Sequence, residues 1–423
     1  MKGDSRTSTI KSVPPWAPSA GADAEAELLI KEARARARRR RRRLAVVLIG
    51  SLAVIAGVFA AVRGPSGQAP ARRVDGRRPS AAAPAVAPAA APLFFADTQG
   101  SGEGNGPLQI RATATGGLVW QEPDATSFDD LTGLAAVGQR SFVIARTVGN
   151  TCATRIYRVR LSTTGLPGAL APVGPTLPGL LWSLTVGDGG QVIGYAMSEC
   201  SKGAPGYLGV LQVSSGRTRQ WGGMSLGGES SGDLALRGQL SMSANGGLLA
   251  FAADASSGPY GPITSQSVRV MATDAPPGSV ERYSHVVYRH APASEGAGPS
   301  LAAASLSPSG KSVYLCLESA SRTDATAEIA TYGTSTGKPG GMITTFSAKG
   351  TWPQVSCSSM SMDSSGWFLL VPYGVSHQAP SSYMLLQRVA RIDLATRAVS
   401  TVRVSLPGSG GISQASGMSI VAW

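Results

Sequence analysis

Histidine and cysteine are scarce in this chain, which has three of the first and four of the second in 423 residues. The histidines, His285, His290 and His377, stand in polar sequence without metal-ligand spacing between them. No Cys-x-x-Cys or Cys–His pair has the spacing of a zinc site either. The sequence therefore predicts no metal and no cofactor, and it places the three histidines in exposed loops.

Residues 93–423 also lack an excess of either charge. They contain 21 Lys and Arg against 19 Asp and Glu, a net of +2, although the whole chain has a formal net charge of +13. The excess lies in residues 1–43, at +7, and in residues 63–92, at +4. A nucleic-acid-binding domain concentrates positive charge on its folded surface, so we expect no nucleic-acid partner.

The longest uncharged apolar run comprises residues 44–62. As a helix, these 19 residues span about 28 Å, close to the thickness of a bilayer's hydrocarbon core. The run directly follows six arginines: Arg38, Arg39, Arg40, Arg41, Arg42 and Arg43. Because arginine resists translocation, we predict an uncleaved signal anchor in the cell membrane, with the N-terminus in the cytoplasm and the C-terminal part outside. A signal peptide cleaved after Ala60 is the alternative.

The segments on either side of this run have different compositions. Residues 1–43 form a cytoplasmic tail that becomes helical in composition from Ala22. This tail either docks a cytoplasmic partner, as membrane-bound regulators of sigma factors do, or is a disordered tail. Residues 63–92 are rich in proline and alanine and have too few large apolar side chains to form a core. They should act as a semi-extended spacer, so the folded domain is expected at residues 93–423.

Two further membrane interpretations follow from the same region. The arginine block suits the anionic lipid head groups of the inner face, or it serves only to fix the topology. Within the predicted span, Ala53 and Gly57 form a small-xxx-small pair that could bring two helices together, although such pairs also arise by chance in alanine-rich spans.

Residues 93–423 contain no segment of helical period, but one pattern recurs. A short apolar or serine-rich strand precedes a tight turn with glycine, and a strongly apolar strand follows. The recurring segments are GLAAVGQRSFVIA, SLTVGDGGQVIGYA, SMSANGGLLAFAA, SLSPSGKSVYLCL and SMDSSGWFLLVPY. Their turn glycines are Gly138, Gly189, Gly246, Gly310 and Gly366. Glycine suits such turns because hairpins require a positive φ at a central position.

A second hairpin follows the apolar strand of each repeat. In its first strand Tyr157, Val159 and Leu161 alternate with Arg158 and Arg160, which is typical of an outer antiparallel strand with one wet face. Four strands per repeat at an average glycine spacing of about 57 residues are typical of propeller blades. The sequence therefore predicts an all-β fold, a six-bladed β-propeller, with a pair of β-sandwiches as the alternative. The sixth blade would combine the two ends of the domain and so close the ring.

The repeats also resemble a known family. The segment from Ser305 to Leu315, SLSPSGKSVYL, looks like the S-P-D-G hairpin of TolB-type and WD-like propeller repeats. Residues 391–396, RIDLAT, resemble the D-x-x-T-G turn of such blades, with Arg397 where glycine is usual. The architecture is similar to uncharacterised single-span actinobacterial membrane proteins with an outer WD-like domain. This resemblance implies a fold but no chemistry, because propellers host many functions.

All four cysteines, Cys152, Cys200, Cys316 and Cys357, lie in the predicted outer domain. Four cysteines allow three connectivities. The separation of each sequential pair is about one blade, which favours Cys152–Cys200 and Cys316–Cys357. Disulfides suit an oxidising compartment.

Three motifs match catalytic or ligand-binding sequence patterns but lack the flanking secondary structure that such sites require. Residues 228–232 read G-x-S-x-G, but loop and short-strand sequence flanks them instead of the strand and helix of a nucleophile elbow. The glycines between Gly100 and Gly106 precede no helix that could hold a phosphate. Asp363, in a segment similar to the Asp-box of sialidases, is expected to form a turn. We therefore predict no catalytic residue.

Two functions remain. The outer domain could be a binding or sensing module for a protein, a peptide or a glycan. Alternatively, the chain could be a transmembrane regulator whose tail binds a partner such as a sigma factor. An extracytoplasmic hydrolase is the third alternative.

Overall fold

The structure is a computed structural model. It describes residues 91–100, 105–123, 131–148, 151–200, 206–225, 234–256, 263–291, 299–350, 353–379, 382–404 and 418–423. The predicted tail, the span at 44–62, the pair Ala53 and Gly57, the six arginines and the spacer up to residue 90 lie outside these residues. In the described part of the chain, no helix is both long and apolar enough to cross a membrane. The chain divides into two compact units, residues 1–85 and 86–423, and the fold below is that of the second.

Antiparallel sheets account for most of the described residues. They form five hydrogen-bonded sheets, the largest with nine strands. This largest sheet has two antiparallel halves, which join through short parallel pairs: Met224 and Ser225 with Leu234 and Ala235, and Trp221 and Gly222 with Gly278 and Ser279. Counting the halves separately gives six units, each with four principal strands.

The strands follow each other in chain order within every unit except the first. Unit 1 consists of β27 (Met418–Ala422), β1 (Phe94–Gly100), β2 (Asn105–Ala112) and β3 (Leu118–Gln121). Unit 2 consists of β4 (Leu131–Gly138), β5 (Ser141–Thr147), β6 (Ala153–Arg160), β7 (Ala171–Pro172) and β8 (Leu177–Pro178). Unit 3 consists of β9 (Leu180–Gly187), β10 (Val192–Ser198), β11 (Gly206–Gln212) and β12 (Arg217–Ser225), with the 3-10 turn η1 (Asp188–Gly190) between β9 and β10.

The remaining three units repeat this plan. Unit 4 consists of β13 (Leu234–Met242), β14 (Leu248–Ser256), β15 (Ile263–Ala272) and β17 (Ser284–His290). The short β16 (Gly278–Ser279) and α2 (Val280–Tyr283) connect β15 to β17. Unit 5 consists of β18 (Ser300–Leu306), β19 (Ser312–Ala320), β20 (Asp324–Gly333) and β21 (Pro339–Lys349). Unit 6 consists of β22 (Gln354–Cys357), β23 (Ser361–Met362), β24 (Phe368–Ala379), β25 (Ser382–Asp393) and β26 (Val399–Arg403).

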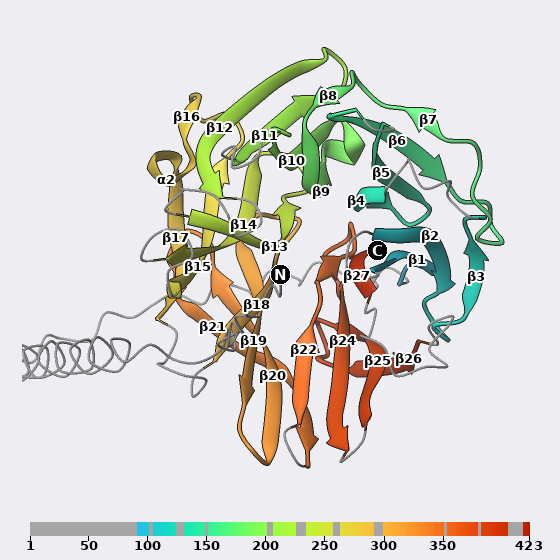
Figure 1. The fold of residues 1–423 in the computed structure, drawn as a ribbon, viewed down its shortest axis with the longest axis vertical. Coiled ribbons are helices and arrows are strands. Elements are labelled where there is room, and N and C mark those ends of the chain that lie inside the picture. The colour runs from blue at the N-terminus through green and yellow to red at the C-terminus, as the bar shows by residue number, and fades with distance from the viewer. Residues whose placement is uncertain are drawn as a thin grey trace, which may run out of the picture. The chain divides into compact units, whose positions relative to one another are not determined.

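The units stand around a common centre, and each directs its first strand inward (Figure 1). The core lies between the units. Six clusters of buried apolar side chains occur in the described residues, one between each unit and the next. One of them joins unit 6 to unit 1 through Phe368 and Leu370 on one side and Phe95 and Trp423 on the other. The predicted all-β propeller fold is therefore confirmed.

Both ends of the domain meet in unit 1, as the sequence predicts. Strand β27 pairs antiparallel with β1, and Ala96 lies opposite Ala422. The indole of Trp423 donates to the Thr113 hydroxyl at 3.2 Å and stands edge-on to Phe368 with ring centres 6.0 Å apart. The last strand of the chain is thus the innermost strand of the first unit, a position that the sequence alone did not identify.

Four of the five predicted turn glycines have the expected backbone. Gly189, Gly246, Gly310 and Gly366 have φ between 59° and 76°. The prediction is wrong at Gly138, which is not among the residues of positive φ, and a Cβ atom added there would meet nothing within 4 Å. The β4–β5 turn places residues 139 and 140 at its tip instead, so no positive φ is required of Gly138.

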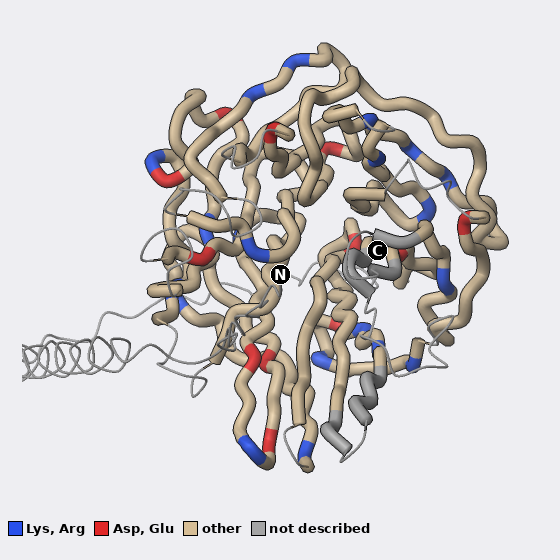
Figure 2. Tube along the Cα trace, viewed as in Figure 1, with Lys and Arg blue, Asp and Glu red and all other residues tan. Residues whose placement is uncertain are grey.

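The alternating strand behaves as predicted. Strand β6 is the third strand of unit 2, outside β5. Its Val159 is fully buried against the unit 1 interface, whereas Arg160 is exposed. Figure 2 shows Lys, Arg, Asp and Glu spread over all the units instead of gathered on one of them, in keeping with the small net charge of residues 93–423.

Candidate functional site

The repeated turns between the first and second strands of the units share one local structure. In three of them a side chain at the start of the turn accepts the backbone N–H five residues later. The three bonds are Leu248 N to Ser243 Oγ at 2.9 Å, Ser312 N to Ser307 Oγ at 3.1 Å and Phe368 N to Asp363 Oδ1 at 2.8 Å. Asp363 is therefore a turn-forming residue, as predicted. The pattern explains why Ser, Ser and Asp occupy equivalent positions of the repeat.

These turns also bind one another around the centre of the ring. Asp188 N donates to the carbonyl oxygen of Ala244 at 2.5 Å, and Ala244 N donates to that of Pro308 at 2.8 Å. At Gly366 a Cβ atom would lie 3.2 Å from the Pro308 ring, so the turn of unit 6 packs closely on the turn of unit 5. We call the four connected turns, residues 187–190, 243–247, 307–311 and 363–367, the collar.

A second set of bonds joins the innermost strands below the collar. In each, a serine hydroxyl of one unit accepts a backbone N–H from the next. The three bonds are Leu240 N to Ser183 Oγ at 2.8 Å, Leu306 N to Ser241 Oγ at 2.8 Å and Trp423 N to Ser361 Oγ at 3.0 Å. An inner strand has no sheet partner on the side of the centre, so these hydroxyls satisfy amides that would otherwise have none.

Ser305 stands at the equivalent position of unit 5 but makes no such bond. The inner strand that follows it is interrupted, because β22 ends at Cys357 and β23 begins only at Ser361. Four of the five recurring segments begin with a serine: Ser183, Ser241, Ser305 and Ser361. Three of these hydroxyls accept an amide N–H of the next unit, and that of Ser305 does not. The signal was present in the sequence as a serine at the start of each segment, but its role depends on which strand comes next in space.

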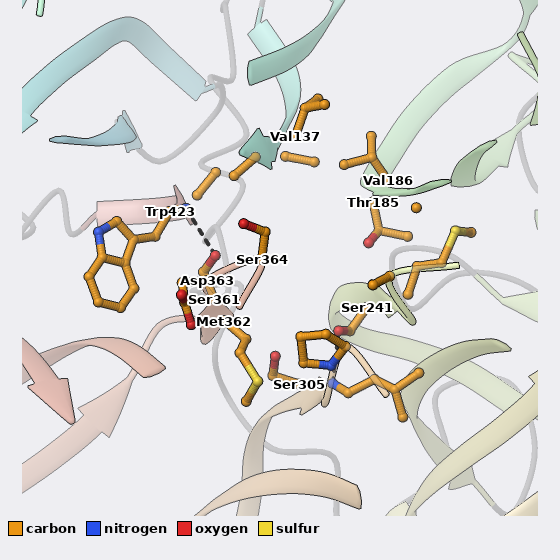
Figure 3. A pocket seen from close by; sticks show the side chains of 18 of the residues that line it. Val137, Thr185, Val186, Ser241, Ser305, Ser361, Met362, Asp363, Ser364 and Trp423 are labelled. Carbon is orange, nitrogen blue, oxygen red and sulfur yellow. Dashed lines mark hydrogen bonds between the residues drawn. The ribbon is translucent and has the colours of Figure 1, made fainter. Parts of the chain in front are cut away.

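The collar surrounds the mouth of a hollow of about 250 Å³ (Figure 3). Residues of all six innermost strands line it, from β4, β9, β13, β18, β23 and β27. At the rim lie the exposed turn residues Gly189, Ala244 and Ser364, whereas Leu184 and Thr185 are buried further in. The hollow therefore has an exposed rim at the collar and buried lining residues between the inner strands.

The lining combines apolar side chains with hydroxyls and the side chain of Gln239, and it contains no Lys, Arg, His or Cys among the described residues. Val137, Val186 and Met362 supply apolar surface. Thr185 and Ser305 turn their hydroxyls toward the space, at exposed fractions of 8% and 2% (Figure 3). Neither hydroxyl has a hydrogen-bond partner in the described part of the chain, so both are available to a ligand.

Asp363 is the only carboxylate in this lining among the described residues, and both of its oxygens are engaged. Oδ1 accepts the N–H of Phe368, and Oδ2 accepts the N–H of Ser365 at 3.2 Å and also the Ser365 hydroxyl in a short contact. Among the described lining residues it has no His, Lys or Cys beside it. The arrangement suits binding.

A second polar cluster is buried in unit 1, on the side of unit 6. The Nε of Arg111 donates to Asp97 Oδ2 at 3.1 Å, and its other nitrogens donate to Gln109 Oε1 and to the Gly116 carbonyl. Asp97 is 0% exposed, and its Oδ1 has no partner in the described residues. Burial raises the pKa of Asp97 to about 6, against the opposing charge of Arg111. Nothing in the sequence pattern singled out this pair.

The four cysteines form the two disulfides that the sequence spacing favoured. Cys152 is bonded to Cys200, with Cα atoms 5.7 Å apart, and Cys316 to Cys357, with Cα atoms 6.6 Å apart. Each disulfide joins one unit to the next. Glu318 Oε1 accepts the Cys357 N–H at 2.7 Å, and burial raises the pKa of Glu318. The carboxylate and the two sulfurs are close together, but the sulfurs are already bonded to each other.

The predicted loop positions of the histidines are wrong. His285 and His290 lie on β17, and His377 lies on β24. The Nε2 of His285 is 2.9 Å from the Thr334 carbonyl oxygen, which links units 4 and 5, and the Nε2 of His290 is buried without a partner among the described residues. The polar residues around these histidines resemble loop sequence; β17 is an edge strand of its sheet, whereas His377 lies near the end of the long strand β24.

Most of the other motifs weighed in the sequence lie outside the described residues. The G-x-S-x-G segment at 228–232 and the glycines at 102 and 104 lie outside the described residues, as do the six arginines. Gly100 ends β1 and Gly106 lies in β2, and these two strands pair antiparallel.

Comparisons with known proteins concern the fold. No protein-family model and no curated protein matches the chain. Among solved structures, TolB from Acinetobacter baumannii is 13% identical with a TM-score of 0.43; the match covers 78% of this chain and 66% of TolB, about two thirds of its length. A periplasmic gluconolactonase from Pseudomonas aeruginosa is 14% identical with a TM-score of 0.40, covering 74% of this chain and 96% of that one. A putative TolB from Agrobacterium tumefaciens is 14% identical with a TM-score of 0.38, covering 67% and 83%.

Proposed function

We propose that this chain is a membrane-anchored, extracytoplasmic binding or sensing module without catalytic activity. The observation that supports it most is the hollow inside the collar, where free hydroxyls and apolar side chains from separate units surround one small space. Concave sites of this kind, with few polar groups in fixed positions, are typical of ligand binding. The ligand is a protein, a peptide or a glycan, or part of one, that reaches the collar from outside the cell.

The location rests on separate observations. Two disulfides join neighbouring units, which supports an oxidising compartment. The uncharged run at 44–62 behind six arginines supports a single span with the N-terminus inside, where the arginines contact anionic lipid head groups. The near-neutral charge of residues 93–423 supports a partner other than nucleic acid.

A photo-crosslinking experiment in intact cells tests the binding function. The photoreactive residue p-benzoylphenylalanine replaces Ser364, which is exposed at the rim, or Ser347, which is exposed on the outer strand β21 as a control. We expect an adduct from position 364 that is absent at position 347, and mass spectrometry identifies it. Equal adducts at both positions, or none at position 364, would contradict a site at the collar.

A further inference from the structure

The size, charge and hydroxyl groups of the hollow point to one class of ligand. We propose that it binds a single uncharged sugar ring, either a free monosaccharide or one residue of a glycan. This inference rests on the proposed binding function and specifies its ligand.

The volume limits the ligand to about one ring. About 250 Å³ is below the range of roughly 300–1,000 Å³ that is usual for drug-sized ligands. The inner strands are tied to each other at Ser183, Ser241 and Ser361, so the walls are joined across units. A folded peptide segment or the surface of a protein would remain outside the collar.

The electrostatics of the lining disfavour an anionic group. A buried charge requires a counter-charge or several hydrogen bonds. The described lining offers no cation, and its single carboxylate, Asp363, already accepts bonds from Ser365 and Phe368. A phosphate or a carboxylate would therefore enter without a counter-charge and against the charge of Asp363, whereas an uncharged ligand has no such cost.

The buried hydroxyls require a ligand that both donates and accepts hydrogen bonds. Thr185 and Ser305 come from units 3 and 5 and have no partner among the described residues. A ligand that covered these hydroxyls without bonding to them would leave buried polar groups unsatisfied, and a ligand hydroxyl avoids this because it can act as donor or acceptor.

The apolar side chains around these hydroxyls complete the match. Val137, Val186 and Met362 line the same space (Figure 3), and they also pack against the apolar clusters between neighbouring units. A pyranose has hydroxyls at its edge and C–H groups on its two faces, so it can satisfy Thr185 and Ser305 while covering apolar surface. Simple hydrocarbons would leave the hydroxyls unpaired, and polyanions would lack a cation.

Calorimetric titration of the purified full-length chain tests this. The probes are the methyl glycosides of glucose, galactose and mannose, with methyl glucuronide as the charged counterpart. We expect at least one neutral glycoside to bind with a dissociation constant near 1 mM, an affinity of about 4 kcal/mol. We expect methyl glucuronide to bind at least tenfold more weakly.

Two matched pairs of variants locate the binding. Thr185→Val and Ser305→Ala remove the two free hydroxyls, and each should weaken binding about two- to tenfold. Thr264→Val and Ser319→Ala make the same changes at exposed hydroxyls of units 4 and 5 away from the hollow. These two variants should leave sugar binding unchanged. Should either pocket variant fail to fold, Ser364→Ala at the exposed rim replaces it.

Three results would overturn the inference: no binding of any neutral glycoside up to about 20 mM, equal binding of the glucuronide, or binding that the pocket variants leave unaltered. The crosslinking experiment separates this outcome from failure of the binding function. An adduct with a protein or peptide at position 364 together with absent sugar binding would refute the sugar and retain the module.

Discussion

Asp97 and Arg111 form a buried ion pair whose carboxylate is more costly to charge in the folded domain than in the unfolded chain. Burial raises the pKa of Asp97 from 3.8 to about 6. Above pH 6 the folded state holds a charged Asp97 at a cost, and below pH 3.8 both states are protonated and the cost is gone. The contribution of Asp97 to stability therefore increases as the pH falls from 6 to 3.8, by about 3 kcal/mol in total.

The direction of this pH dependence can be measured with the variant Asp97→Asn. As the pH falls from 7 to 4, the free energy of unfolding of the wild type should increase relative to that of the variant. Urea unfolding at a series of pH values gives both free energies. A difference that stays constant with pH would show that Asp97 titrates normally in the folded domain.

Gly187 and Gly138 stand at the ends of two equivalent inner strands and offer a test of the collar. A Cβ atom on Gly187 would lie 2.5 Å from the Cα and 2.7 Å from the amide nitrogen of Gly246, whereas one on Gly138 would meet nothing within 4 Å. Gly187→Ala forces two turns apart and should cost about 1–3 kcal/mol. Gly138→Ala should leave the melting temperature unchanged or slightly raised, because neither residue needs a positive φ. Thermal unfolding of both variants checks this, and equal melting would refute close packing at the collar.

At the scale of the element, the inner strands depend on hydroxyl bridges that only some serines make. Ser183 and Ser305 occupy the same position of the repeat and are both buried, but only Ser183 accepts an amide, that of Leu240. Ser183→Ala leaves that buried N–H unpaired and should cost about 1–3 kcal/mol, whereas Ser305→Ala should cost less than about 0.5 kcal/mol. Denaturant unfolding compares the two free energies. Similar losses in both would mean that Ser183 contributes through packing alone.

The sequence predicted the elements well where one residue determines the backbone. Gly246, Gly310 and Gly366 mark their turns because a positive φ excludes most other residues. Cysteine spacing favoured the disulfides for a similar reason, since neighbouring units repeat at a fixed length. The free hydroxyl of Ser305 could not be predicted, because it depends on the gap between β22 and β23 in the next unit. The buried Asp97–Arg111 pair could not be predicted either, because in the sequence each residue looks like an ordinary polar position of an alternating strand.

At the scale of the whole molecule, closure of the ring depends on β27. Removing residues 412–423 takes away β27 and Trp423, which is 2% exposed, and uncovers Phe95 and Phe368. Loss of a buried tryptophan alone costs about 3–5 kcal/mol, a large share of ordinary domain stability. We expect the truncated chain to aggregate or to become protease-sensitive throughout residues 93–423. Limited proteolysis and thermal unfolding test this.

The control for this truncation is the removal of residues 1–12, which belong to the other compact unit. It should leave the unfolding temperature of residues 93–423 unchanged. If the chain without residues 412–423 unfolds like the intact one, β27 does not close the ring.

Topology is the second prediction at this scale. A phosphatase reporter fused after Trp423 should be active, since it folds only after export, and residues 93–423 should be cut by protease added to intact cells. Neutral residues in place of Arg38–Arg43 should produce mixed orientation, because the other flank also carries arginines. An active cytoplasmic reporter at the same position would refute the orientation.

The position of β27 also determines when the domain can finish folding. Synthesis proceeds from the N-terminus, so β1 is made long before β27, the strand that pairs with its inner edge. Until residues 418–422 have been made, Ala96 and its neighbours lack an inner strand, and unit 6 lacks the indole that it packs against. A chain that stops before β27 therefore leaves an open seam between units 6 and 1, where proteases can reach side chains that the closed ring buries.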